Sequence, residues 1–309
     1  MKISLYTITL NGGYYDGPHV PLLEIFPKAK QWGYDGIEIE AKRPHGSPLD
    51  LDAAARDRIR KAADDHGLEI SCIAAYNDYS SPIDEHSENE LLMTREQIRL
   101  AADLACPIVR VFPAWSGVTR RDGRITYHVA RYNIDHRYPG TTALERWHHV
   151  RECLAEAATM AEDAGVTLAL QNHAPIVTHY QHVLDFINEV DSPALKACLD
   201  APLMQRHTEE YYREAIEVTG DLLVHTHYGG RFEEQPDGTV TKLRDTTRPP
   251  GSDERAFLKA ARDIVDYKGH IGYELCSPVL TAHRHEGLDY ALLQAELACP
   301  YMRQIIDSL

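Results

Sequence analysis

LALQNH, at residues 168–173, is the first of four segments that read as strands ending in metal ligands; the others are ACLD at 197–200, LLVHTHY at 222–228 and GYEL at 272–275. Each places an amide, a carboxylate or an imidazole where a short apolar run meets polar loop sequence. These groups together are ligands for a divalent cation such as Mn²⁺, Mg²⁺, Co²⁺ or Zn²⁺, and the oxygen ligands favour the first two. Because helix-like stretches separate the segments, they predict a metal site at one end of a barrel.

The same alternation extends through all 309 residues. The expected strands are 2–8, 35–40, 68–75, 107–113, 166–171, 195–200, 221–227 and 270–276. The expected helices are 21–32, 50–66, 88–105, 143–164, 179–190, 208–219, 253–267 and 286–307. Glycines stand at the joints between helix and strand, at Gly33, Gly67, Gly165, Gly220 and Gly269. Parallel strands need helical crossovers, so eight such units predict a (β/α)8 TIM barrel.

An open doubly wound sheet is the alternative architecture, since it produces the same alternation. Its usual glycine-rich phosphate turn is missing, because TLNGGYYDG at 9–17 lacks the GxGxxG spacing. No internal boundary or repeat is evident, and we predict one TIM-barrel domain over residues 1–309.

Composition excludes several classes of function. A net charge of −15 and a pI near 5.5 argue against a surface for nucleic acid or for an anionic membrane. The opening MKISLYTITL reads as a strand and lacks the features of a signal peptide, and no run approaches the roughly 18 apolar residues of a membrane span. The six cysteines form no CxxC pair, so we expect buried free thiols in a cytoplasmic protein.

Two connections are too long to be simple loops. Residues 114–142 follow the fourth strand and form a locally basic, aromatic-rich stretch that includes Trp115 and His136. Residues 228–252 follow the seventh strand. Both lie on the face where barrel enzymes build their sites. Long loops in compact domains are often lids or binding loops, so we expect these to cover substrate or contact another subunit.

Each candidate ligand could instead have a purely structural role. Gln171 could bond to backbone, Asp200 could cap a helix, and His173 could be a satisfied structural histidine. Residues two apart share a strand face, so His225 points with His227, and the latter lies nearer the loop. Glu274 lies on an apolar strand, where a charged carboxylate is costly unless it is paired or bound to metal.

Three further residues are candidate substrate ligands. Glu38 and Glu40 share one face of the second strand and could line the barrel mouth, or could pair with Lys42 or Arg43 outside. Arg231 follows the glycine pair after the seventh strand and could bind a sugar oxygen; a surface arginine is the alternative.

These strand ends resemble the xylose-isomerase-like barrels, which include sugar-phosphate isomerases and epimerases, ketose 3-epimerases and inosose dehydratases. The resemblance covers the whole chain, including MKISLYT at its start and GYDGIEIE at 33–40. In that superfamily the fifth to eighth strands supply Glu, Asp, His and Glu to one divalent cation. The resemblance implies that Gln171, Asp200, His227 and Glu274 are the ligands here.

The chain departs from the epimerases at two positions. Gln171 replaces a glutamate that is both ligand and acid/base, and Leu203 stands where a histidine is frequent. Glutamine cannot carry a proton, so another group must, and His173 is the nearest titratable candidate. The combination of QNH, LDAPL, HTHYGG and the bulky loop after strand four looks like the larger subunit of bacterial C-glycoside deglycosidases.

That likeness implies a metal-dependent lyase. His173 would remove the C2 proton of a 3-oxo-glucoside, with Glu274 as the second catalytic group, and the aglycone would leave C1. Trp115, His136, Glu38 and Arg231 would bind substrate, and a small β subunit or further copies of the chain would be partners. One alternative is a ketose or sugar 3-epimerase or isomerase acting through an enediolate. Another is a non-catalytic subunit whose site has decayed.

Overall fold

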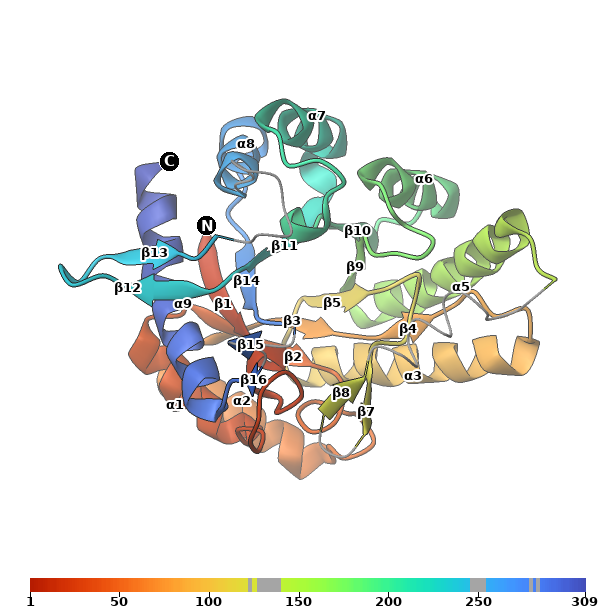
Figure 1. Cartoon of the computed structure of the whole chain (residues 1–309). Helices are drawn as coiled ribbons and strands as arrows, with labels where there is room; N and C mark the ends of the chain where they lie inside the picture. The colour runs from red at the N-terminus through yellow and green to blue at the C-terminus, as the bar shows by residue number, and fades with distance from the viewer. Residues whose placement is uncertain (122–123, 127–139, 245–253, 278–279, 282–283) are drawn as a thin grey trace.

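Eight parallel strands form a closed barrel in the computed structural model, which describes residues 1–121, 124–126, 140–244, 254–277, 280–281 and 284–309. Around the barrel the strands follow the order β1-β14-β11-β10-β9-β5-β3-β2 (Figure 1). Their bounds are β1 Lys2–Tyr6, β2 Gly36–Glu40, β3 Glu69–Ala74, β5 Ile108–Val111, β9 Thr167–Gln171, β10 Leu195–Cys198, β11 Leu223–Gly229 and β14 His270–Glu274. The predicted TIM barrel is confirmed, and the open sheet is excluded because β1 pairs with both β2 and β14.

Helices cover the outside of the barrel between successive strands (Figure 1). They are α1 Leu22–Trp32, α2 Ala53–His66, α3 Asp84–Asp103, α5 Ala143–Ala164, α6 Tyr180–Val190, α7 Glu209–Thr219, α8 Arg255–Val265 and α9 Leu288–Ser308. Two starts differ from the expected ranges by three residues or more. Helix α2 begins at Ala53 rather than 50, because the Asp52 side chain accepts a hydrogen bond from the Ala55 N–H and caps the helix. Helix α3 begins at Asp84, four residues before the expected start, with acidic side chains in its first turn.

The C-terminal ends of the helices follow the glycine pattern in part. Gly33, Gly67 and Gly165 end their helices in the left-handed conformation that glycine adopts without strain. At the last joint the expectation was wrong: α8 ends at Val265, and the residue that caps it in the left-handed conformation is Asp266 (φ 49°) rather than Gly269.

Alternation along each strand separates two environments. Ile37 and Ile39 of β2 belong to the hydrophobic core between barrel and helices, and Val109 and Val111 of β5 do the same. The residues between them point to the other face and into the barrel lumen, because side chains two apart share a face of a strand. The lumen is polar for this reason: it receives Glu38, Arg110, Gln171 and both histidines of β11, all of them buried.

The two long connections carry small antiparallel elements. After β5, β6 (Ala114–Trp115) pairs with β4 (Asn77–Asp78), and β7 (Thr119–Arg121) pairs with β8 (Arg124–Thr126). After β11, β12 (Phe232–Glu234) and β13 (Val240–Lys242) form a hairpin that projects beside α9 (Figure 1). Lys42 contacts the first connection, because its Nζ donates a hydrogen bond to the Val118 carbonyl oxygen at 2.9 Å.

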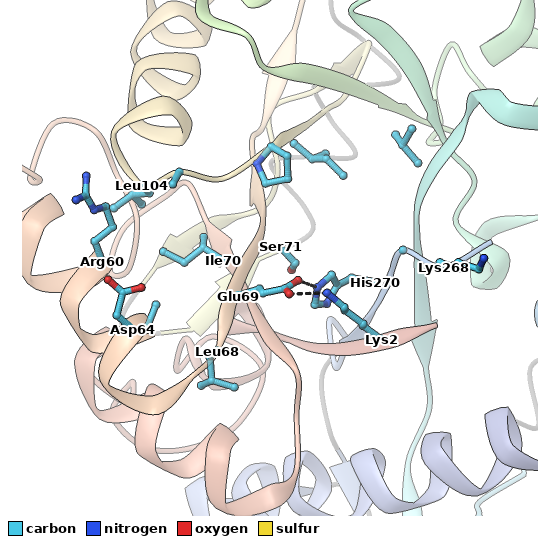
Figure 2. A pocket seen from close by; sticks show the side chains of 16 residues that line it. Lys2, Arg60, Asp64, Leu68, Glu69, Ile70, Ser71, Leu104, Lys268 and His270 are labelled. Carbon is cyan, nitrogen blue, oxygen red and sulfur yellow. Dashed lines mark hydrogen bonds and ion pairs between the residues drawn. The ribbon is translucent and has the colours of Figure 1, made fainter. Parts of the chain in front are cut away.

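The other end of the barrel, where the strands begin, holds a cavity of about 820 Å³ (Figure 2). Glu69 of β3 accepts hydrogen bonds there from Lys2 of β1 and, at 2.8 Å, from Nε2 of His270 of β14. This network joins the starts of three strands and lies at the opposite end of the barrel from the predicted ligands.

Two expectations from composition can be compared with the fold. None of the six cysteines forms a disulfide, and five of them are buried, as predicted. Among the described residues, no helix is long and apolar enough to cross a membrane.

Candidate metal centre

The four predicted ligands lie at the carboxyl ends of four neighbouring strands. Gln171 is the last residue of β9, Asp200 follows β10 by two residues, His227 lies in β11 and Glu274 ends β14. These strands are adjacent in the barrel order β14-β11-β10-β9 (Figure 1). The barrel therefore brings together side chains that are separated by up to about a hundred residues in sequence.

Three of the four form a compact cluster. Asp200, His227 and Glu274 each offer one ligand atom, and these atoms all lie within 4.8 Å of one another. Nδ1 of His227 is 3.3 Å from Oδ2 of Asp200. The Gln171 amide nitrogen donates to the same Asp200 oxygen, so Gln171 joins the cluster at its edge.

Two buried oxygens of this cluster lack a partner within the described part of the chain. They are Oε1 of Gln171 and Oδ1 of Asp200, in side chains that are 3% and 0% exposed. A buried acceptor without a donor is costly, and an anionic one more so. A divalent cation would satisfy both oxygens, and amide, carboxylate and imidazole are donors that such a cation accepts. The residues present therefore fit a single metal ion.

The cluster concentrates negative charge around Glu274. Burial raises the pKa of the Glu274 carboxyl, His227 opposes this shift, and Asp200 and Glu38 add to it, so that the pKa lies at about 7. Such crowding of carboxylates around one imidazole is what a bound cation would relieve.

The turn that presents Asp200 is held by Asn172. Its side-chain oxygen accepts the Asp200 backbone N–H at 2.6 Å, and its amide nitrogen donates to the Asp200 carbonyl oxygen at 3.3 Å. Asp200 makes no capping hydrogen bond to the short helix that follows it, Ala201–Leu203. The alternative role for the Asp200 carboxylate, capping a helix, is therefore excluded.

Glu38 lies beneath the cluster rather than at the open mouth. Both of its oxygens contact Nε2 of His227, at 3.1 and 3.2 Å, and Oε2 also accepts from Nε2 of His225 at 2.9 Å. Burial alone would raise the pKa of Glu38, but the two imidazoles hold it well below its usual range. This position favours a role in holding His227 over the predicted contact with substrate. Sequence reasoning set His225 aside, although the H-x-H spacing already put it on the same face.

His173 lies at the mouth, between two aromatic rings. The ring centroids of Phe112 and Trp115 are 4.7 and 4.8 Å from that of its imidazole. Burial against them lowers the pKa of His173 to about 4, so the imidazole is neutral at pH 7. Nδ1 lies against the Ala174 carbonyl oxygen, which assigns the proton to Nδ1 and leaves Nε2 as the acceptor.

The other predicted substrate ligands differ in where they lie. Trp115 is at the mouth beside His173. Arg231 follows β11 and is half-buried, and its carbonyl oxygen accepts a hydrogen bond from the Leu243 N–H. His136 lies outside the described residues.

Arg110 of β5 is a buried cation that sequence reasoning missed. Its guanidinium donates to the Tyr6 hydroxyl at 2.8 Å and to the Ala75 carbonyl oxygen at 2.7 Å, and it lies 4.0 Å from the Phe112 ring centroid. The Tyr6 hydroxyl is 2.8 Å from that of Tyr76, and the Tyr6 ring stacks on His227. The signal was present in IVRV, where a charge stands at the lumen position of an apolar strand.

The comparisons with known proteins identify the family of the chain. Residues 26–293 match the family described as xylose isomerase-like TIM barrel. The chain belongs to this family. It is 28% identical over 282 residues to fructoselysine 3-epimerase of Shigella flexneri, across 88% of this chain and 90% of the relative.

Solved structures share the fold at lower identity. A D-psicose 3-epimerase has a TM-score of 0.71 and 18% identity over 99% of both chains. A 3-keto-D-glucoside 4-epimerase from E. coli has a TM-score of 0.68 and 18% identity, over 98% of this chain and 99% of that one. The chain is an enzyme of the sugar epimerase/isomerase type.

Proposed function

We propose that this enzyme uses one divalent cation to remove a proton from the carbon next to the ketone of a sugar derivative. The observation that carries the proposal is the cluster of Asp200, His227 and Glu274, of which the first two are buried. Asp200 and Gln171 each have an oxygen there without a partner among the described residues. When bound there, Mn²⁺ or Mg²⁺ would polarise the ketone and so acidify the neighbouring C–H bond.

His173 is the base in this proposal. It is neutral at pH 7, and its Nε2 carries the lone pair at the mouth of the barrel. Glu274, at the end of β14, is the second group able to exchange a proton with a substrate oxygen. Gln171 can only bind, because an amide exchanges no proton in this pH range.

The finer proposal is elimination from a 3-oxo-glucoside. The C2 proton passes to His173, a double bond forms between C1 and C2, and the bond from C1 to the aglycone breaks. The aglycone keeps the electron pair and takes a proton. Gln171 supports this outcome, since epimerisation by two carboxylates on opposite faces of the sugar lacks its second carboxylate here. Trp115, half-buried beside His173, offers a ring on which a flat aglycone could stack.

A second candidate is epimerisation at C3 of a substituted ketose. The likeness to fructoselysine 3-epimerase over most of both chains favours it. It shares the first step and differs in its end: the proton returns to the opposite face of the same carbon, and no bond to a leaving group breaks.

Product analysis separates the two candidates. The Mn²⁺-loaded chain would be incubated in D₂O with a 3-oxo-glucoside of a phenol and, separately, with fructose and fructoselysine, and products would be followed by NMR. Elimination predicts release of the phenol, with loss of that activity in His173→Ala and retention in His148→Ala, whose histidine is exposed on α5. Rapid interconversion of the ketoses with the phenyl glycoside left intact would refute elimination and support the second candidate.

The small β subunit remains a prediction from the resemblance. Light scattering of the purified chain, with assays of that chain alone, would test whether activity needs a partner.

A further inference from the structure

We propose that Glu38 is a positioning residue that fixes which nitrogen of His227 faces the metal. It accepts the Nε2–H of His227 and so leaves the Nδ1 lone pair directed at the cluster of Asp200 and Glu274. This inference rests on the proposed metal site and adds to it a buried carboxylate and a defined tautomer.

The contacts of His227 give the first step. Each ring nitrogen lies beside a different carboxylate: Nδ1 is 3.3 Å from Asp200, and Nε2 is 3.1 Å from Glu38. A neutral imidazole has one N–H and one lone pair, so only one of these carboxylates can receive a proton from it. In the metal-bound chain the other nitrogen would carry the lone pair, and the cation would lie between that nitrogen and its carboxylate.

Glu38 decides which nitrogen keeps the proton. Its Oε2 also accepts from Nε2 of His225, at 2.9 Å, so two imidazoles converge on one carboxylate. An ionised carboxylate can only accept hydrogen bonds. Both imidazoles must therefore donate through Nε2, which leaves Nδ1 of His227 as the ligand atom on the side of Asp200.

A glycine between the two strands allows the Glu38 side chain to contact His227. Glu38 is on β2 and His227 on β11, and β14 and β1 lie between them in the barrel order. Those two strands contribute Gly272 and Ser4, which pair with each other in register. A Cβ built at Gly272 would overlap Oε2 of Glu38 and would lie 2.8 Å from Cδ2 of His227. Glycine at this position keeps the path between carboxylate and imidazole open.

A second cation site is the rival interpretation, because Glu38, His225 and His227 also form a group of potential ligands. With one neutral imidazole, the two groups exclude each other. Nε2 of His227 either donates to Glu38 or binds a metal, and the contacts of 2.9 to 3.2 Å on Glu38 are ordinary hydrogen-bond lengths.

Cadmium NMR tests the proposal on the wild-type chain. The protein, labelled with ¹⁵N at histidine, would be loaded with ¹¹³Cd²⁺, and the metal–nitrogen coupling would be assigned to a ring nitrogen. We expect one cadmium per chain, coupled to Nδ1 of His227, with its Nε2 carrying a proton. Coupling to Nε2, or two cadmium ions per chain, would overturn the proposal. A chain that binds no cadmium overturns the metal site itself, and this inference with it.

Variants give a second readout. Glu38→Gln should weaken cadmium binding about 10- to 100-fold, the usual effect of removing a carboxylate behind a metal-bound histidine. Ser4→Ala is the matched control, since it alters a buried side chain in the same part of the barrel and should leave cadmium affinity unchanged. Equal affinity in a folded Glu38→Gln chain contradicts the positioning role. If that variant does not fold, the wild-type spectrum still decides between the two nitrogens.

Discussion

Replacing Gly272 with alanine should damage stability and metal binding together. Gly272 lies in β14, paired with His227 of β11, and its missing side chain leaves the space that Glu38 fills. The added methyl group would overlap Oε2 of Glu38 and approach Cδ2 of His227 to 2.8 Å. Because ordinary carbon contacts are about 3.5 to 4.0 Å, Glu38 must move away from the two histidines.

The size of the effect follows from two contributions. Overpacking a well-filled interior costs about 1 to 3 kcal/mol. Withdrawing Glu38 weakens its hydrogen bonds with His225 and His227, and bonds to a charged group contribute about 1.5 to 3 kcal/mol each. We expect Gly272→Ala to lose about 3 to 5 kcal/mol of unfolding free energy. At about 2 °C for each kcal/mol in a chain of this size class, the Tm should fall by about 6 to 10 °C.

Gly229→Ala is the matched control. Gly229 lies in the neighbouring strand β11, and a Cβ there would meet Pro202 and Glu274 only at ordinary contact distances, 3.6 and 3.8 Å. Thermal unfolding with and without Mn²⁺, together with a manganese titration, would measure both effects. If Gly272→Ala matched Gly229→Ala in Tm and in manganese affinity, the argument that Glu38 needs this space would be refuted.

The other predictions concern the cluster, the base and the far end of the barrel. Asp200→Asn should abolish stoichiometric metal binding while the chain stays folded, as measured by metal content and circular dichroism; full occupancy would exclude Asp200 as a ligand. His173→Ala should lower turnover about 10²- to 10⁴-fold and keep the metal, so unchanged turnover would rule out this base. Stability should fall as the pH drops below about 6.5, because burial lowers the pKa of His270 and the unfolded chain then binds its proton more readily. A further loss should follow at more acid pH, where Glu69, whose pKa is lowered by His270 and Lys2, becomes protonated; urea unfolding at several pH values should show a flatter decline in His270→Gln.

Much of the fold was readable because its signals are local. Apolar runs such as 166–171 and 270–276 have the length of strands, and amphipathic stretches between them have the period of helices. Helix boundaries were less predictable. The first turn of α3 is polar and lacks apolar periodicity, and its acidic side chains are favourable because they lie at the helix N-terminus. The conformation of Asp266 at the end of α8 is another case, since an aspartate there carries no signal as strong as that of glycine.

Some residues of the candidate site were predictable from the sequence and others were not. The sequence predicted that Asp200, His227 and Glu274 lie close together, because polar groups that end apolar strands must meet at the carboxyl edge of a parallel barrel. It did not assign Arg110 to the lumen or pair Glu38 with His225, since those contacts depend on strands that are far apart in the chain.

By itself, the order of residues determined the number of strands, their direction and the chemical types of the ligands, since each depends on neighbours along the chain. Only the closed barrel determined which side chains face one another across the lumen. The physical reason is that closure makes β1 a neighbour of β14 and brings Glu38 across Gly272 to His227, a meeting that no local pattern encodes.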